Sequence, residues 1–272
     1  LNTASGEANS EIQFAIAYAD NTGGGAAAYN YAVNAYSPST TTYGSYRTLV
    51  LEDENATFKF GEFEASYFYA LSIERARYRE TLFPGSMNLQ LSSSRSGATV
   101  VLELTDNSQD VTIPTYYGTM RAYQVVSGSN GSAYNFSTGG TGFTSDKGSY
   151  GLMLPDIGTI LLNGAALDLD TVEGINLGTD RTENTDGNNA QKLFLAMSGS
   201  ITSVNPGSQF SLNCQETITS DYVFVRARSS EFNYSENPSF ISGSTGEVIY
   251  PYFINNPNVF PTTVGLYNNG ND

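Results

Sequence analysis

Short runs of β-prone residues, separated by glycine, serine, asparagine and proline, dominate the chain. Apolar and polar residues alternate most clearly at 57–63 (TFKFGEF) and 87–91 (MNLQL). Such alternation is typical of strands buried on one face. The pattern therefore predicts a mainly β fold of antiparallel, sandwich-like sheets. The predicted strands are 46–51, 57–63, 66–79, 87–91, 101–104, 151–154, 159–162, 210–213, 222–227 and 262–267.

Two long stretches and one short segment depart from this pattern. Residues 20–45 are low in charge and rich in Gly, Ala, Tyr and Thr, which predicts an extended arm. Residues 127–151 are rich in Gly, Ser and Thr and predict a long loop or inserted arm. One short helix is predicted near 188–198, where Asn188 or Asn189 offers an N-cap and Gly199 a stop.

These differences divide the chain into three parts that we expect to form one continuous assembly unit. They are a β-rich N-terminal part at 1–126, a loop-rich middle at 127–205 and a C-terminal β part at 206–272. The strand predicted at 262–267 leads into a turn-like NNGND sequence, and Asn-Gly normally introduces a hairpin partner. We expect that partner strand to be missing from the sequence or to come from another molecule.

The charge balance excludes two classes of protein. The 272 residues include 12 Lys and Arg against 27 Asp and Glu, a formal net charge of −15. A nucleic-acid binder needs a concentrated basic surface, so we expect no nucleic-acid partner. No apolar run approaches the roughly 20 residues that span a bilayer, so we expect no membrane insertion.

Two scarce residue types narrow the possible chemistry. The chain has no histidine, the commonest general base and metal ligand, and Cys214 is its only cysteine. An intramolecular disulfide and a thiolate zinc site are therefore impossible. Cys214 lacks a basic neighbour in sequence and is predicted to be a small buried hydrophobe. The chain begins at Leu1 without the charge and hydropathy pattern of a signal peptide.

Carboxylates are the one catalytic chemistry left by this composition. Asp168 and Asp170 share a face of an assumed strand, and Glu52, Asp53 and Glu54 lie together. A glycosidase would need two carboxyl groups about 5 to 10 Å apart across a sugar cleft. We interpret these side chains as solvated or turn carboxylates, with the glycoside hydrolase as the weaker alternative, and we predict no catalytic residues.

The stretch 180–189 (DRTENTDGNN) superficially resembles a calcium loop. Aligning Gly187 with the loop glycine places Leu193 where a bidentate Glu is required, so the motif fails. We interpret it as an ordinary loop before a helix, and predict no metal and no cofactor.

Five of the twelve cations occur in or next to two of the predicted strands. Arg75, Arg77 and Arg79 share one face of the strand at 66–79, and Arg226 and Arg228 repeat the spacing. Guanidinium groups in such a row could dock onto an acidic neighbouring subunit. The alternative is neutralisation by acids of the same subunit.

Two stretches of sequence resemble a known family. The first is residues 46–91, which contain YRTLVLEDENATFKF and FYALSIERARYRETLFPGSMNLQL. The second is residues 223–267, which contain EFNYSENPSF and most of PTTVGLYNNGND. Together they cover about a third of the chain. They are similar to virion structural proteins of tailed bacteriophages, particularly cyanophages with contractile tails. In that family the GLYN motif runs on into an apolar strand. The matching motifs are structural, and the resemblance implies no active-site residue.

The resemblance and the composition together predict a structural subunit of a phage virion, in the tail, baseplate or neck. Its expected partners are copies of itself and other virion proteins, and its expected location is the virion, assembled in the host bacterial cytoplasm. One alternative is a tail module that binds a receptor or a host-surface glycan through exposed Tyr side chains. A capsid or decoration protein is another.

Overall fold

The computed structural model describes two compact units, Leu1–Thr217 and Ile218–Asp272, which we treat separately. The sequence-based boundaries at 126 and 205 both fall inside the first unit. The described residues are 11–27, 37–61, 63–95, 98–134, 136–137, 140–141, 149–170, 174–198, 210–226, 228, 231–260 and 263–265.

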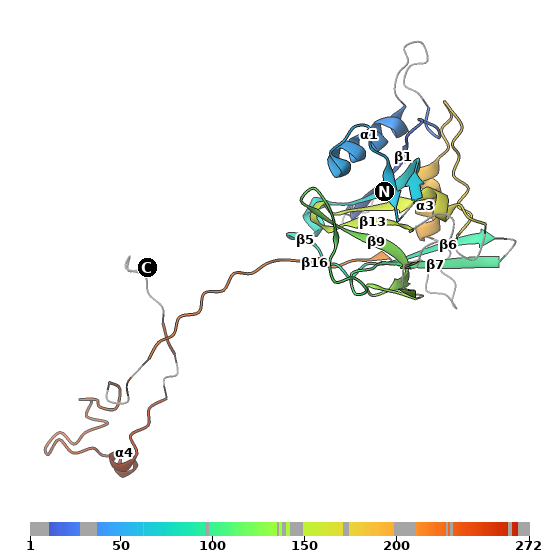
Figure 1. Cartoon of the computed structure of the whole chain (residues 1–272). Helices are drawn as coiled ribbons and strands as arrows, with labels where there is room; N and C mark the ends of the chain where they lie inside the picture. Colours follow the sequence, from blue (N-terminus) through green and yellow to red (C-terminus); the bar gives the residue numbers. More distant parts are fainter. Residues whose placement is uncertain are drawn as a thin grey trace. The chain divides into compact units, whose positions relative to one another are not determined.

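One curled antiparallel sheet forms the first unit (Figure 1). It resembles half of a barrel, so the mainly β, antiparallel prediction is confirmed, and the predicted sandwich-like arrangement is instead one curled main sheet. Two further strands, β8 (Thr115–Tyr117) and β10 (Ser132–Ala133), pair with β9. In sheet order the main strands are β1 (Phe14–Asp20), β4 (Tyr67–Ile73), β14 (Thr159–Asn163), β13 (Gly151–Leu154), β9 (Met120–Ser129), β7 (Ala98–Asp106), β6 (Asn88–Arg95) and β15 (Phe210–Ser211).

Three two-stranded pairs accompany the main sheet. The strand predicted at 57–63 is a hairpin, because the chain turns at Gly61, whose φ of 68° is readily adopted by glycine. The long loop predicted at 127–151 is partly wrong, because the segment begins inside β9 and contains β10 and two further short strands, β11 (Phe136–Ser137) and β12 (Gly140–Thr141). Residues 135, 138–139 and 142–148 of it lie outside the described residues. The pairs are β2 (Phe58–Phe60) with β3 (Phe63–Ala65), β5 (Thr81–Leu82) with β16 (Cys214–Gln215), and β11 with β12.

The central strands are buried on both faces. In β4, Tyr69 and Leu71 point into the space enclosed by the curl, whereas Phe68 and Ala70 belong to a second apolar cluster on the opposite face. The second cluster includes Tyr43 and other residues of helix α1 (Pro38–Leu51). Burial on both faces explains why β4, β13 and β14 read as continuous apolar runs without alternation.

Helix α1 corrects two predictions, the strand at 46–51 and the extended arm at 20–45. Ser37 caps the helix by accepting a hydrogen bond from the Thr40 amide (3.3 Å), and Pro38 occupies its first turn. The Tyr43 hydroxyl donates to the Ala65 carbonyl (2.9 Å), so packing outweighs the β-prone composition. Residues 28–36 of the predicted arm lie outside the described residues.

The helix predicted near 188–198 is confirmed as α3 (Asn189–Ser198). Its Leu193, Ala196 and Met197 are buried in the enclosed core, and the helix packs against β1 and β6. The expectation of a single helix is wrong, because α1 is longer than α3. The shorter helices are α2 (Gly164–Leu167), α4 (Pro251–Asn255) and the 3₁₀ turns η1 (Arg75–Arg77) and η2 (Pro155–Ile157). None of the helices in the described ranges is long and apolar enough to cross a membrane.

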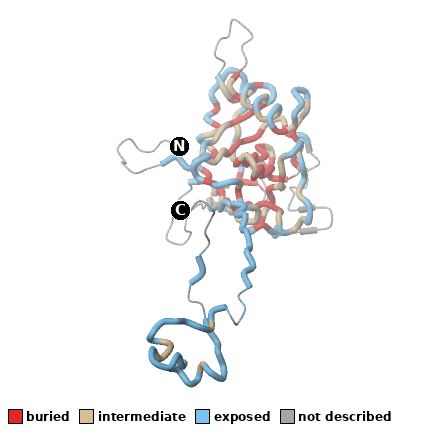
Figure 2. The backbone as a smooth tube through the Cα atoms, turned by 90° about the vertical axis from the view of Figure 1, so that its left-hand side faces the viewer, coloured by how far each residue is buried: buried red, intermediate tan, exposed pale blue. Residues whose placement is uncertain are grey.

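The second unit is largely exposed (Figure 2). The ring of Phe240 contacts the rings of Tyr234, Tyr250 and Phe253, at centroid-to-centroid distances of 5.3 to 6.5 Å. An isolated bridge joins Ile241 to Val248. The strand predicted at 222–227 is wrong for 222–226, which forms none. Residues 263–265 are likewise not in a strand, and the remainder of 262–272 lies outside the described residues.

Candidate functional site

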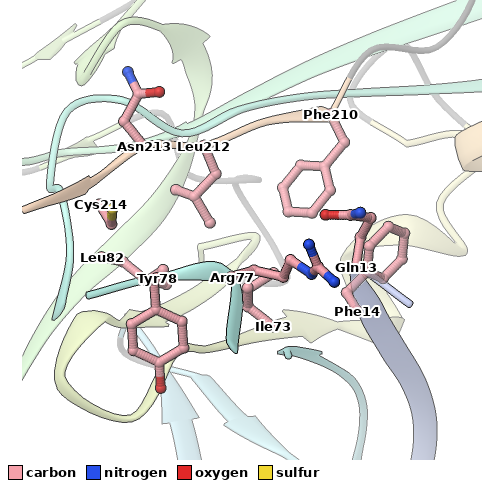
Figure 3. Close-up of a pocket in the computed structure, with 10 residues that line it drawn as sticks. All are labelled: Gln13, Phe14, Ile73, Arg77, Tyr78, Leu82, Phe210, Leu212, Asn213 and Cys214. Carbon is pink, nitrogen blue, oxygen red and sulfur yellow. The ribbon is translucent and has the colours of Figure 1, made fainter. Parts of the chain in front are cut away.

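A largely apolar pocket of about 250 Å³ lies beside the first and last strands of the sheet order, with Gln13, Arg77 and Asn213 as its polar lining residues (Figure 3). We call it the seam pocket. Within the described strands, β1 pairs only with β4 and β15 pairs only with β6, so these two strands are the free edges of the sheet. Phe14 of β1 and Phe210 of β15 meet beside the pocket, with ring centroids 5.3 Å apart. The lining residues are Gln13, Phe14, Ile73, Arg77, Tyr78, Leu82, Phe210, Leu212, Asn213 and Cys214.

Hydrogen bonds hold the two sides of the seam pocket in place. On the β1 side, the Glu74 amide donates to the Gln13 carbonyl at 2.9 Å. On the opposite side, the Phe83 amide donates to the Asn213 carbonyl (2.9 Å), and the Asn213 amide donates to the Ser86 hydroxyl (3.0 Å). The apolar walls are therefore supported by backbone bonds.

Cys214 is exposed at the rim of the seam pocket, so its prediction as a buried residue is wrong. Its strand β16 pairs with β5 through only two residues, Cys214 opposite Leu82 and Gln215 opposite Thr81. So short a pairing leaves little structure to cover the thiol. Of the pocket residues, Arg77 and Cys214 were singled out in the sequence. The apolar walls were not, because no local pattern brings Phe14 and Leu82 beside Phe210 and Leu212.

The arginine row predicted on a strand does not exist at 75–79. Strand β4 ends at Ile73, and Arg75 and Arg77 lie in the 3₁₀ turn η1. Arg75 donates to the carbonyls of Tyr78 (2.8 Å) and Arg79 (2.7 Å) and stacks on the Tyr78 ring. The guanidinium group thereby holds the chain in a compact turn, which ends the regular strand.

Two acids of the same chain face the other arginines of this group. Arg77 forms a close ion pair with Glu11, and its Nε donates to the Ile12 carbonyl. Arg79 lies 3.9 Å from Glu216, with both side chains largely exposed. The geometry favours neutralisation within the subunit at Arg77, while docking through these residues stays a prediction.

Arg226 and Arg228 differ from the first group. Both belong to the second unit, and neither lies in a strand. Among the described residues, no acidic side chain forms an ion pair with either guanidinium group, although the Arg228 amide donates to Glu231 (2.8 Å). Their docking role stays a prediction.

The carboxylates considered for catalysis are dispersed. Asp168 ends α2 rather than occupying a strand, and its oxygens accept from the Tyr67 hydroxyl (2.9 Å) and from the amide and hydroxyl of Thr179 (2.9 and 2.8 Å). Residues 52–54 are exposed in the turn after α1. Asp168 therefore fastens the loop that contains Thr179 to β4.

The loop at 180–189 is stabilised by local hydrogen bonds. Asp180 accepts from the amide (2.9 Å) and hydroxyl (2.6 Å) of Thr182, and Asp186 accepts from the Asn188 amide. The bonds from Thr182 lower the pKa of Asp180. Within the described ranges, no group of three or more acidic or thiol side chains is placed to hold a metal ion.

A partly buried ion pair that the sequence did not reveal joins Asp20 of β1 to Arg181, 161 positions later. Arg181 Nε lies 2.6 Å from Asp20 Oδ2, while Asp20 also accepts from Thr22 and from the Tyr18 hydroxyl. The guanidinium group stacks on the Tyr67 ring at 4.4 Å. Burial alone would raise the pKa of Asp20, but hydrogen bonds from Arg181 and Thr22 outweigh burial and lower it. The network holds the loop after α2 against the β1–β4 edge.

Comparisons with known proteins found no match. Neither the protein-family models, nor the curated proteins, nor the solved structures include one that matches this chain.

Proposed function

We propose that this chain is a structural subunit of a phage virion, in the tail, baseplate or neck, that acts by self-association and by docking to other virion proteins. The resemblance of residues 46–91 and 223–267 to such proteins motivates the proposal. The observation that carries it is the exposed apolar surface of the second unit. There Ile218, Phe224 and Phe260 are 79%, 97% and 85% exposed.

Exposure of so many apolar side chains to water is thermodynamically unfavourable for an isolated protein. Burial of apolar area contributes about 25 cal/mol per Å², so aromatic and β-branched side chains left in water favour association. Segments that become ordered on assembly can cover large surfaces of a partner. The first unit adds a sheet with a dense enclosed core, in which β1 and β15 each pair on one side only within the described residues.

The proposed function requires no catalytic step. Asp168, the best-placed candidate, has its oxygens occupied by Tyr67 and Thr179. Arg77 and Arg181 are likewise engaged with acids of the same chain. These polar groups support the fold, which suits a subunit whose function is to present surfaces.

Light scattering of the purified full chain over a range of concentrations, with negative-stain imaging, tests this proposal. We expect a defined multimer, such as a ring or tube, whose symmetry would distinguish a tail ring from a capsid piece. A monomer at every concentration would contradict self-association and favour an adhesin or decoration module.

Exposed tyrosines favour a second candidate, a glycan- or receptor-binding tail module. Tyr222, Tyr234 and Tyr252 of the second unit are exposed and could stack on sugar rings. A saturable signal on a glycan array that is lost in Tyr222→Ala and Tyr252→Ala would support this candidate. An array without signal would leave assembly as the better explanation of these side chains.

A further inference from the structure

We propose that residues 222–225 of one copy insert between β1 and β15 of a second copy, with Phe224 in the seam pocket. The inference rests on the proposed function, since it specifies how copies associate. The inserted segment would supply the strand that the half-barrel lacks.

The inserted segment has the properties of a strand without a partner. Tyr222, Val223, Phe224 and Val225 are consecutive, apolar and exposed, and the described residues give 218–226 no strand pairing. β-branched and aromatic residues favour a pleated, half-buried backbone. In a strand, alternate side chains face opposite sides, so Tyr222 and Phe224 would point one way and the two valines the other.

The seam offers this segment a matching acceptor. The pocket volume of about 250 Å³ is large enough for a phenyl ring, since a cavity of about 150 Å³ binds benzene. Seven of its ten lining residues offer apolar or aromatic contacts, and the polar ones are Gln13, Arg77 and Asn213. Within the described residues, β1 and β15 each pair on one side only, so their other edges offer backbone groups on both sides of the pocket. Entry of the segment would separate the rings of Phe14 and Phe210, which contact each other in the free chain, and the two rings would then flank the entering ring.

Charge complementarity favours a second copy as the donor of the segment. Residues 1–217 contain 22 acidic and 10 basic side chains, a formal charge of −12, so each copy presents an acidic surface. Arg226 directly follows the apolar segment, and Arg228 lies two positions further on. Glu216 lies near the pocket rim, two residues after Cys214, with half of its side chain exposed and only a 3.9 Å pairing to Arg79. The guanidinium groups of the inserted segment could therefore meet acids of the receiving copy.

The first test compares two aspartate variants of the full chain by light scattering. Phe224→Asp should weaken association at least about tenfold, because a buried Phe contributes one factor of ten or more to affinity. Ile254→Asp makes the same charge change at another exposed position of the second unit, 64% exposed, and should leave association unchanged. Both side chains are exposed and belong to the second unit, so we expect the melting temperature of the first unit to be unchanged in both variants.

The outcomes separate this inference from the proposed function. If the natural chain is a monomer at every concentration, both are overturned. If the natural chain associates and Phe224→Asp associates equally well, only the insertion is overturned. Equal weakening by both variants would also overturn it, since a general charge effect would then explain the loss.

A second test uses Cys214 at the rim of the acceptor pocket. Mild oxidation of Phe224→Cys should join the introduced thiol of one copy to Cys214 of the next and give a ladder on a non-reducing gel. Ile254→Cys, the matched control, should form such a ladder at least about tenfold more slowly. A disulfide-bonded monomer, or equal rates for the two variants, would overturn the second copy as the source of the segment.

Discussion

The ring of Phe14, on the first strand of the sheet order, packs edge-on against the ring of Phe210, on the last. Their centroids are 5.3 Å apart and their planes meet at 88°, the favourable geometry for an aromatic pair. Because the two residues belong to opposite edges, their contact brings the ends of the sheet together. Helix α3, which packs on β1 and β6, covers another part of the same opening.

Removing the Phe14 ring should loosen the seam. We expect Phe14→Ala to lower the free energy of unfolding by about 1 to 3 kcal/mol, less than for a fully buried Phe because Phe14 is only partly buried. Urea unfolding of the full chain measures the change. Ile113→Ala, at a side chain 76% exposed, should shift stability by less than about 0.5 kcal/mol. Equal effects of the two substitutions would show that the seam contact contributes nothing.

Breaking the ion pair at Asp20 should be more damaging. Asp20 is fully buried, and Asp20→Asn leaves the Arg181 guanidinium without its counter-charge. We expect a loss of about 2 to 4 kcal/mol in unfolding free energy, less than for a fully buried pair because Arg181 is partly exposed. Arg181→Met combined with Asp20→Asn should cost less than the sum of the two single changes. Strict additivity in this double-mutant cycle would contradict a direct interaction.

The same pair predicts a pH dependence. The pKa of Asp20 in the fold lies below its unfolded value of about 3.9. The pair therefore stabilises the protein fully above that unfolded pKa, and its contribution is lost as the pH falls through the folded pKa. Thermal melts between about pH 7 and pH 2.5 should show a steeper acid loss for the natural chain than for Asp20→Asn. Parallel curves would rule out Asp20 as the source.

Sequence periodicity predicted the sheet strands better than it predicted the segments around them. The runs at 87–91, 101–104, 151–154 and 159–162 all coincide with strands, because each carries its own apolar pattern. The run at 46–51 is equally β-prone but forms part of a helix. There the cap at Ser37 and burial of Tyr43 outweigh local preference, and neither effect is contained in the run itself.

The candidate site was less accessible to sequence reasoning. The spacing of the arginines at 75–79 predicted one face of a strand. In the structure the Arg75 guanidinium group donates to the carbonyls of Tyr78 and Arg79, and residue spacing alone cannot reveal such hydrogen bonds. The seam pocket joins side chains near residues 14, 77 and 212, which only the curled sheet brings together. The pairing of Asp20 with Arg181 likewise depends on the tertiary fold.

The Tyr67 hydroxyl should contribute separately from its ring. Tyr67→Phe removes the 2.9 Å bond to Asp168 but keeps the ring beneath Arg181, so we expect a loss of about 0.5 to 1.5 kcal/mol. Tyr67→Leu removes both contacts and should cost more. Hydrogen exchange at the Thr179 amide, which donates to the same carboxylate, would report loosening of the loop. Unchanged exchange in both variants would contradict the proposed fastening of this loop.

Removing the second unit should leave the first one folded. The clusters that form the enclosed core and the α1 face lie between residues 14 and 212, so a chain ending at Thr217 keeps every residue of both clusters. We expect its thermal midpoint to lie within about 3 °C of that of the full chain, since stability follows buried apolar area. Measured at low concentration, this comparison excludes any gain from association. A fall of about 10 °C or more would show that residues 218–272 stabilise the first unit in the same molecule, and the second unit would then be part of the fold rather than a segment available to partners.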